Sequence, residues 1–316
     1  MVFVRSIRKY MEKSQNNINK KNISIIIPIF NAQQFLPDLF KSLAKCEFLS
    51  GDEVLFVDNG STDDSVKLCK EVAESRQGLY RCLDYSQVPG SYAARNYAVK
   101  QAKGEILVFT DSDCKPTAGW LHALRESVAS GVVVAGKIQI EIVKNGLWEH
   151  FDVIAHLNSE KNAAGNRVAT ANMAVMRSDF DKVGLFEERF SGGDYDWSMR
   201  AAASGMKVVF VPEALVYHPS RKTFAEILKK EQRIAYGAGN HARLKNQSCF
   251  LLRLKYFLKI FKVDTNLRYM KQLKKAGMDR KTLWEFNWKF MRIRVEQLKY
   301  AVKGYKQTDV RKLGIK

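Results

Sequence analysis

The sequence predicts an α/β fold with a mainly parallel central sheet, followed by a basic α-helical C-terminal extension. From Ile23 onward, short apolar runs alternate with amphipathic helical segments, which is the pattern of βαβ units. Beyond Thr223 the chain has few Gly or Pro residues and reads as helices rich in Lys and Arg. A chain of 316 residues is long enough for one large domain with such an appendage.

The first half of the chain contains four strand–helix pairs. The expected strands cover residues 23–29, 53–57, 79–83 and 105–109. The expected helices cover residues 33–44, 62–73, 92–102 and 119–127. Ser61 is a good N-cap for the second helix, and Asp63 and Asp64 carry favourable negative charge in its first turn.

After Val132 the alternation loosens. Strands are expected at 132–142, 169–176 and 207–211, and helices at 148–158 and 194–203. We therefore divide the chain into a basic N-terminal arm at 1–22, an α/β domain at 23–220 and a helical extension at 221–316.

The net charge of +19 is concentrated in the extension. Residues 221–316 hold 26 Lys and Arg against 7 Asp and Glu, whereas residues 1–220 hold 26 of each. The first 22 residues add a second basic segment, with six basic residues and one Glu. This asymmetry indicates an anionic partner surface, either a membrane or a nucleic acid.

The cysteines and the hydropathy pattern predict a cytoplasmic protein. The five cysteines are scattered and never spaced as Cys-x-x-Cys, which argues against a disulfide framework or a zinc site. The N-terminus lacks the apolar core of a signal peptide, and no run of eighteen apolar residues predicts a transmembrane helix.

The most informative motif is Asp111-Ser112-Asp113, which follows the apolar run 106–109. In an open α/β sheet, ligands bind at the carboxyl ends of the strands. Two carboxylates with no Lys or Arg between them make a poor core but a good cation site. Because Mg²⁺ binds through one or two carboxylates plus substrate phosphates, this motif indicates a metal–diphosphate substrate, although an Asp-rich surface turn would look the same.

Polar turns also follow the first two strands. Residues 28–31 (Pro-Ile-Phe-Asn) and 58–61 (Asp-Asn-Gly-Ser) are placed where a nucleotide base and ribose can dock. Asp58 can accept hydrogen bonds from a base N–H or a ribose hydroxyl. The alternative is that residues 58–61 simply form a turn and a helix cap.

Three further side chains are candidates for the site. Arg95, in the small-residue helix start 90–96, can reach a phosphate or form a buried pair with an Asp. Asp194, after Gly192 and Gly193, is suited to act as a general base, although Asp194 and Asp196 also fit a helix N-terminus. His218 follows the last strand and can supply a third ligand to a carboxylate metal site, where imidazole suits Mn²⁺ better than Mg²⁺; the alternative is a purely structural histidine.

Five short motifs in this order, with a late His, resemble an inverting family 2 glycosyltransferase with the Rossmann-like glycosyltransferase A fold. They are Pro-x-Phe-Asn, Val-Asp-Asn-Gly-Ser-Thr-Asp, Ala-Arg-Asn, Asp-Ser-Asp and Gly-Gly-Asp-x-Asp-Trp, between Ile23 and Pro219. The resemblance implies a nucleotide-sugar site built from Pro28, Phe30, Asn31, Asp58, Arg95, Asp111, Ser112 and Asp113.

The resemblance also assigns roles within that site. Asp113 would be the direct metal ligand, with His218 and Asp111 beside it, and Asp194 would be the catalytic base. Asn172 and Trp197 would lie on the acceptor side. The family usually has Glu-Asp where this chain has Gly193-Asp194, so Asp196 is kept as the second choice for the base.

The function implied is metal-dependent sugar transfer, with inversion, from a UDP-sugar to an acceptor hydroxyl. Mg²⁺ or Mn²⁺ would be the cofactor, and the acceptor would be a carbohydrate or a lipid-linked molecule in bacterial cell-surface polysaccharide or glycolipid synthesis. A nucleotidyltransferase would need a glycine-rich phosphate loop near the first strand, and a dehydrogenase would need Gly-x-Gly-x-x-Gly; neither occurs. A basic nucleic-acid-binding protein is the remaining alternative, although the chain carries no recognisable nucleic-acid motif.

Residues 250–262 combine apolar clusters with Arg253, Lys255, Lys259 and Lys262. This segment is too short and too charged to span a bilayer but resembles an interfacial helix. It predicts a peripheral location on the anionic inner face of the cell membrane. The alternative is that the helix packs on the rest of the chain with its charges solvated.

Overall fold

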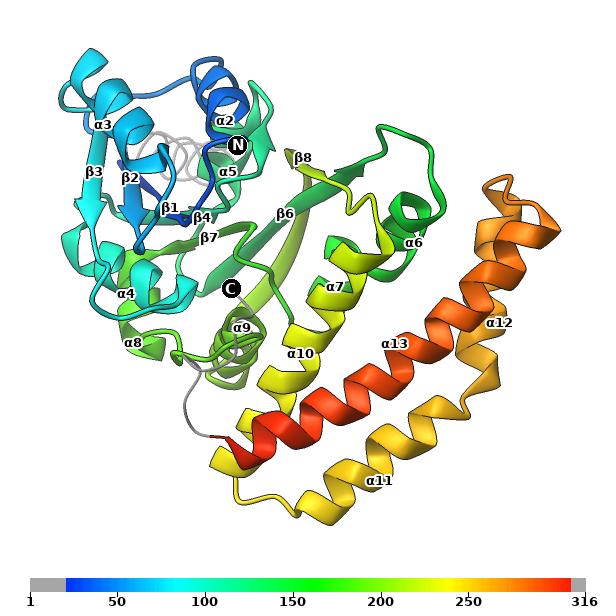
Figure 1. The fold of residues 1–316 in the computed structure, drawn as a ribbon. Coiled ribbons are helices and arrows are strands. Elements are labelled where there is room, and N and C mark those ends of the chain that lie inside the picture. The colour runs from blue at the N-terminus through cyan, green and yellow to red at the C-terminus, as the bar shows by residue number, and fades with distance from the viewer. Residues whose placement is uncertain (1–20, 308–316) are drawn as a thin grey trace, which may run out of the picture. The chain divides into compact units, whose positions relative to one another are not determined.

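The computed structural model describes residues 21–307, so nearly all of the arm expected at 1–22 lies outside the described residues. The chain divides into two compact units. Unit 1 comprises the chain up to Gln139, together with Asn158–Glu188 and Asp194–His218. Unit 2 comprises Ile140–Leu157, Arg189–Gly193 and the chain from Pro219 onward. Figure 1 labels most of the elements of both units.

Unit 1 is built on an eight-stranded sheet in the order β3-β2-β1-β4-β7-β6-β8-β5. The strands are β1 (Ile23–Ile29), β2 (Glu53–Asp58), β3 (Tyr80–Asp84), β4 (Ile106–Thr110), β5 (Lys115–Pro116), β6 (Val132–Glu141), β7 (Asn172–Met176) and β8 (Lys207–Pro219). β3, β2, β1 and β4 pair in parallel, whereas β7 is antiparallel to both β4 and β6. The α/β fold class is therefore confirmed, and its parallel half is the region of regular strand–helix alternation in the sequence.

The helices of unit 1 connect and cover these strands (Figure 1). They are α2 (Leu36–Leu43), α3 (Ser65–Ser75), α4 (Ser91–Gln101), α5 (Trp120–Ser127), α7 (Ser159–Ala164), α8 (Arg177–Val183) and α9 (Gly193–Ala203). β1, β2 and β4 are almost wholly buried, as expected for parallel strands covered on both faces. An aromatic cluster completes this core, in which Phe186 packs against Phe109 of β4, Phe180 of α8 and Trp197 of α9.

Unit 2 is helical. It contains α6 (Leu147–Ala155), α10 (Phe224–Leu244), α11 (Cys249–Ile260), α12 (Val263–Lys275) and α13 (Arg280–Lys306). Its main core joins Trp148 and Phe151 of α6 to Phe286 and Phe290 of α13. Helix α6 thus packs with the C-terminal helices, although the sequence analysis placed it in the domain ending at residue 220.

Helices α10 and α13 lie alongside each other at very short range (Figure 1). A Cβ added at Gly239 would lie 1.9 Å from the carbonyl oxygen of Ala301, and one added at Gly304 would lie 2.1 Å from that of Tyr236. Both contacts are with backbone, which cannot rotate away. Glycine is therefore required at these two positions for the helices to approach so closely. None of the helices in residues 21–307 has the length and apolar character needed to cross a bilayer.

Candidate active site

The loop after β4 carries the Asp-x-Asp motif at the carboxyl edge of the sheet. All five residues of β4 are buried, while Asp111, Ser112 and Asp113 are partly exposed. The Thr110 hydroxyl donates a 2.9 Å hydrogen bond to the carbonyl of Ala171 and fixes the point where the strand ends. The two carboxylates are therefore presented from a rigid strand end.

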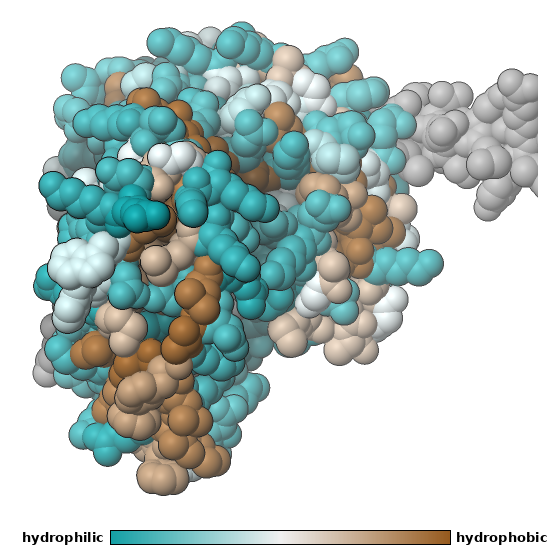
Figure 2. Space-filling model, turned by 90° about the vertical axis from the view of Figure 1, so that its right-hand side faces the viewer, coloured by the Kyte–Doolittle hydropathy of each residue, from teal (hydrophilic) through white to brown (hydrophobic). Residues whose placement is uncertain are grey.

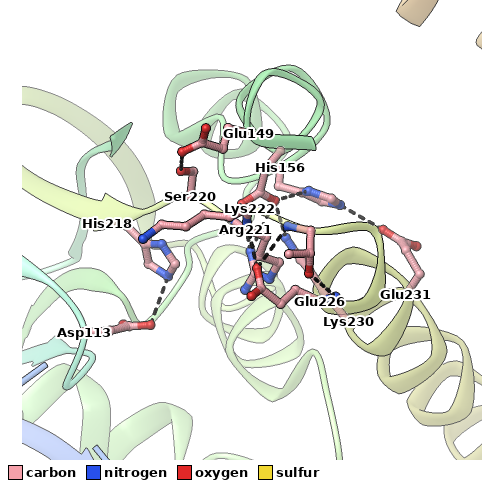
Figure 3. A network of polar contacts seen from close by, with 12 residues as sticks. Asp113, Glu149, His156, His218, Ser220, Arg221, Lys222, Glu226, Lys230 and Glu231 are labelled. Carbon is pink, nitrogen blue, oxygen red and sulfur yellow. Dashed lines mark hydrogen bonds and ion pairs between the residues drawn. The ribbon is translucent and has the colours of Figure 1, made fainter. Parts of the chain in front are cut away.

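Asp113 and His218 face each other (Figure 3). The antiparallel pairing of β5 with β8 places Lys115 opposite Tyr217, which brings the two segments together. His218 Nε2 lies 3.6 Å from Asp113 Oδ2, and the His218 side chain is only 7% exposed. Two ligands of one ion, each about 2.1 Å from it, are separated by at most about 4.2 Å, so this pair fits a single divalent cation.

Asp111 does not join this pair. Within residues 21–307, no three His, Cys, Asp or Glu side chains form a group arranged to hold a metal ion. Asp111 Oδ1 instead accepts a hydrogen bond from Arg95 of α4. In this structure Asp113 and His218 lie as candidate ligands and Asp111 forms an ion pair with Arg95, so the three-ligand set stays a prediction.

Arg95 is buried, and among the described residues not every N–H donor of its guanidinium group has a hydrogen-bond partner. Its side chain is 4% exposed and its terminal nitrogen contacts Asp111, as the Arg–Asp alternative predicted. Its Nε has no hydrogen-bond partner in the part of the chain that the structure describes. A buried donor without a partner is costly, which is consistent with an anion being held there during function.

The turns after β1 and β2 are tied to each other. Asn31, in a left-handed conformation at φ 47°, accepts a 2.8 Å hydrogen bond from the backbone N–H of Thr62. The buried Asp58 carboxylate accepts bonds from the backbone N–H groups of Gly60 and Ser61. The turn role that we kept as an alternative for Asp58 is therefore present, and it leaves carboxylate lone pairs for a further donor.

The remaining candidates for the nucleotide site lie at the same edge of the sheet. Pro28 and Phe30 are half-buried at the end of β1, and Asp58 pairs in register with Ile29. Because the carboxyl ends of these parallel strands share one edge with β4, Pro28, Phe30 and Asp58 flank the Asp-x-Asp loop.

Asp194 lies in the first turn of α9 and is held by three hydrogen bonds. Oδ1 accepts from the Tyr92 hydroxyl at 2.8 Å and from the Tyr195 N–H at 2.9 Å, and Oδ2 accepts from the Thr170 N–H at 3.2 Å. Burial raises the pKa of Asp194 above its ordinary value, although these bonds and the charge of Arg95 oppose the rise. A raised pKa makes the carboxylate a stronger base.

Asp196 is engaged differently. Its Oδ2 accepts a 3.0 Å hydrogen bond from Arg200 Nε one turn along α9. This i,i+4 ion pair is a common way to stabilise a helix surface. The structure thus gives Asp196 a helix-stabilising contact and Asp194 the buried environment of a candidate base.

Tyr92 is a residue that the sequence reasoning missed. It lies on α4 three residues before Arg95, and the Arg95 guanidinium carbon lies 5.5 Å from the centre of the Tyr92 ring. One helix therefore contacts Asp194 through Tyr92 and Asp111 through Arg95. The only signal in the sequence was that Tyr92 falls within the motif at 90–96.

Two predicted acceptor-side residues belong to the core. The Asn172 side chain, 1% exposed, accepts a hydrogen bond from Trp120 and donates to the carbonyls of Lys137 and Ala214. Trp197 is fully buried and stacks on Phe180 at 4.9 Å. Both side chains pack in the core of unit 1 in this structure, and their acceptor-side role stays a prediction.

Unit 2 contains a buried network of charges (Figure 3). Asp152 is fully buried and contacts His156 at 2.6 Å and Arg221 at 3.1 Å, with Lys230 at 3.5 Å. Burial opposes ionisation of Asp152, but these neighbours hold its pKa well below the usual range. Burial also lowers the pKa of Lys230 to about 7. The network fixes Arg221, immediately after β8, to helix α6.

Comparison with known proteins identifies the class. The family described as glycosyl transferase family 2 matches residues 24–184, and glycosyl transferase family group 2 matches residues 148–292. Glycosyltransferase AglE of Haloferax volcanii is 31% identical over 221 residues, which cover 68% of this chain and 72% of that protein. The chain belongs to glycosyltransferase family 2, and it is an enzyme of that class.

Another relative agrees with this class, and solved structures share its fold. An undecaprenyl-phosphate 4-deoxy-4-formamido-L-arabinose transferase of Pseudomonas aeruginosa is 26% identical over 78% of this chain and 67% of its own. A mannosyltransferase from Pyrobaculum calidifontis, solved with GDP-Man and Mn²⁺, superposes with a TM-score of 0.60 at 17% identity, over 90% of this chain and 87% of that chain. TarS 1–349 of S. aureus, with UDP-GlcNAc, has a TM-score of 0.51 at 19% identity over 90% of both chains. These likenesses support the glycosyltransferase A fold.

Proposed function

We propose that this enzyme transfers a sugar from a UDP-sugar to an acceptor hydroxyl, with a divalent metal and with inversion at the anomeric carbon. One observation carries the proposal. Helix α4 joins the candidate base to the Asp-x-Asp loop, because Tyr92 donates to Asp194 while Arg95 pairs with Asp111. A base and a diphosphate site that one helix holds in fixed positions are what a single displacement requires.

The residues of the chain have separate tasks in this reaction. Asp113 and His218 would hold Mg²⁺ or Mn²⁺, which when bound neutralises the charge of the leaving diphosphate. Asp58 would accept hydrogen bonds from the base or ribose beside Pro28 and Phe30, near Asn31 and Ser112. Arg95 would direct its unpartnered Nε–H toward an anionic group.

Asp194 would accept the acceptor proton. The buried carboxylate takes the hydroxyl proton on Oδ1 or Oδ2 as the acceptor oxygen attacks the anomeric carbon. The bond from that carbon to the diphosphate oxygen breaks on the opposite face, so the configuration inverts. The raised pKa of Asp194 favours this transfer, because the proton leaves a weakly acidic hydroxyl.

We further propose a lipid-linked acceptor and a peripheral position on the cytoplasmic face of the cell membrane. Relatives named as undecaprenyl-phosphate transferases support this choice, as does the excess of 26 basic over 7 acidic residues in 221–316. The setting would be synthesis of a cell-surface polysaccharide or glycolipid.

The test is a panel of UDP- and GDP-sugars incubated with the full chain in Mg²⁺, Mn²⁺ or EDTA, with release of nucleoside diphosphate as the readout. We expect slow, metal-dependent hydrolysis of one UDP-sugar, which Asp113→Asn abolishes without unfolding the protein. NMR of a transferred product should show an inverted anomeric centre. Absence of binding and hydrolysis for every donor, or retained configuration, would overturn the proposal; tight DNA binding by the same inactive sample would favour the nucleic-acid alternative.

A further inference from the structure

Within unit 2, one face of helix α11 packs against α10 and α13. Leu252 and Tyr256 are buried, and they pack in a cluster with Ala235 and Ala242 of α10 and Ala301 of α13. The Lys259 ammonium lies over the Tyr256 ring, 4.4 Å from its centre. This face therefore fixes the orientation of α11 and determines which side chains point away from unit 2.

The opposite face of α11 is apolar and exposed. Phe250, Leu254, Phe257 and Phe261 recur at spacings of four, three and four residues, which places them on one side of a helix. With Leu251 and Leu258 they form a stripe roughly 120° wide, at about 100° per residue. These six side chains are between 40% and 69% exposed. Figure 2 shows hydrophobic side chains gathered in the lower part of the face that it turns to the viewer, where α11 lies.

The stripe continues past the end of α11. Val263 and Leu267 of α12 are 63% and 53% exposed. An exposed apolar area built from side chains on two successive helices is more than the scattered single residues that soluble surfaces carry, and it marks an interaction site. We call these eight side chains the α11 surface.

Basic residues border this surface. Residues 249–275 contain eight Lys and Arg and one Asp. By helical spacing, Lys255 and Lys262 flank one side of the stripe and Arg253 the other, and all three are exposed. This arrangement, with apolar side chains in the middle and cations at both margins, is that of a helix lying in a lipid headgroup region.

We infer that the α11 surface docks on an anionic lipid bilayer, with its Phe and Leu side chains among the acyl chains and its Lys and Arg side chains among the headgroups. A second copy of this chain is a poor occupant, because it would bring a second set of eight cations against the first. The stripe lies on a convex helix rather than in a groove, which suits a planar partner. Each cation near an anionic headgroup surface contributes about 1 kcal/mol, so several together hold a protein there reversibly.

This inference deepens the proposed membrane location by naming the surface, and it does not depend on which sugar is transferred. The experiment is co-sedimentation of the full chain with vesicles of phosphatidylcholine alone or mixed with phosphatidylglycerol. Three variants are compared: Phe257→Ser with Phe261→Ser, Lys255→Glu with Lys262→Glu, and the charge-matched control Lys67→Glu with Lys70→Glu on α3. All six substituted side chains are exposed, so each variant should fold.

We expect wild type to bind the anionic vesicles and to be released as salt rises from about 0.1 M to about 1 M, where the Debye length falls to about 3 Å. Each basic residue near an anionic surface changes affinity about fivefold, so the Lys255 and Lys262 variant should bind at least about 25-fold more weakly. The Phe variant should lose at least about tenfold, and the α3 control should bind within about twofold of wild type.

Donor hydrolysis separates this inference from the proposed reaction. The Phe variant should hydrolyse nucleotide sugar like wild type while failing to sediment, and Asp113→Asn should sediment normally while failing to hydrolyse. Equal vesicle binding by the α11 variants and the α3 control would overturn the inference. The inference would also fail if wild type were a dimer, the Phe variant were a monomer and both bound vesicles equally. A second copy of the chain would then be the occupant of the α11 surface.

Discussion

Replacing Asp194 by Asn tests the assignment of the base most directly. Asparagine has nearly the same shape but cannot accept a proton at catalytic pH. If its oxygen keeps the place of Oδ1, the hydrogen bonds from the Tyr92 hydroxyl and the Tyr195 N–H survive. The amide NH₂ then faces the Thr170 N–H, 3.2 Å from where Oδ2 was, and that hydrogen bond is lost.

Two different magnitudes follow from this geometry. One unpartnered backbone N–H costs about 1–3 kcal/mol of stability, and removing a buried charge offsets part of that cost. Loss of a general base slows turnover about 10²–10⁴-fold, equal to about 2.7–5.4 kcal/mol of barrier at 1.36 kcal/mol per factor of ten. Activity should therefore fall far more than stability.

The assay measures kcat for transfer, the Kd for donor and the thermal midpoint of Asp194→Asn, with Asp196→Asn as the matched control. Asp196 forms a partly buried i,i+4 ion pair with Arg200 along α9, and such helical pairs contribute about 0.2–0.5 kcal/mol. We expect the control to transfer sugar like wild type and both variants to bind donor normally. An inactive Asp196→Asn beside an active Asp194→Asn would refute the reasoning and exchange the two roles.

Three further predictions concern other parts of the molecule. Tyr92→Phe removes a hydrogen bond that stabilises the ionised base, so the acidic limb of the pH–rate profile should move to higher pH, with kcat lowered about tenfold and the donor KM unchanged. Gly239→Ala forces a methyl group onto the Ala301 carbonyl and should destabilise unit 2 by about 3 kcal/mol or more in urea unfolding; a neutral effect would disprove the close helix approach. Glu149 is buried, and burial alone would raise its pKa, but hydrogen bonds lower the pKa from 4.5 to about 2. Ionised Glu149 therefore stabilises the fold by about 2–3 kcal/mol above pH 4.5. This contribution is lost as the pH falls toward 2. The stability difference between wild type and Glu149→Gln should accordingly shrink in unfolding curves taken from pH 7 down to pH 3.

The candidate site residues are visible in the sequence where they directly follow a strand end. Asp111 and Asp113 directly follow a buried apolar run, and Asp58 follows another. Parallel strands covered on both faces are continuous apolar runs, so the point where polarity begins is visible in the sequence. Asp194 was visible for a similar reason, because it opens a helix after two glycines.

Residue type alone did not separate site from core. Asn172 and Trp197 belong to motifs that resemble acceptor-side segments, yet one is satisfied by Trp120 and two carbonyls and the other stacks on Phe180. Asp111, predicted beside the metal, contacts Arg95 in this structure. In each case the partner comes from a distant segment, which no local pattern reports.

By itself the sequence determined the strand–helix order, the strand-end carboxylates, the basic extension and the family. Only the tertiary structure decided that Tyr92 holds Asp194, a residue 102 positions away, and that α6 packs with the C-terminal helices. It also decided which face of α11 is buried, since an apolar residue such as Tyr256 or Phe257 fits either side of the pattern. The physical reason is that hydrophobic periodicity specifies which side chains avoid water, whereas the partner that excludes the water is set by long-range packing.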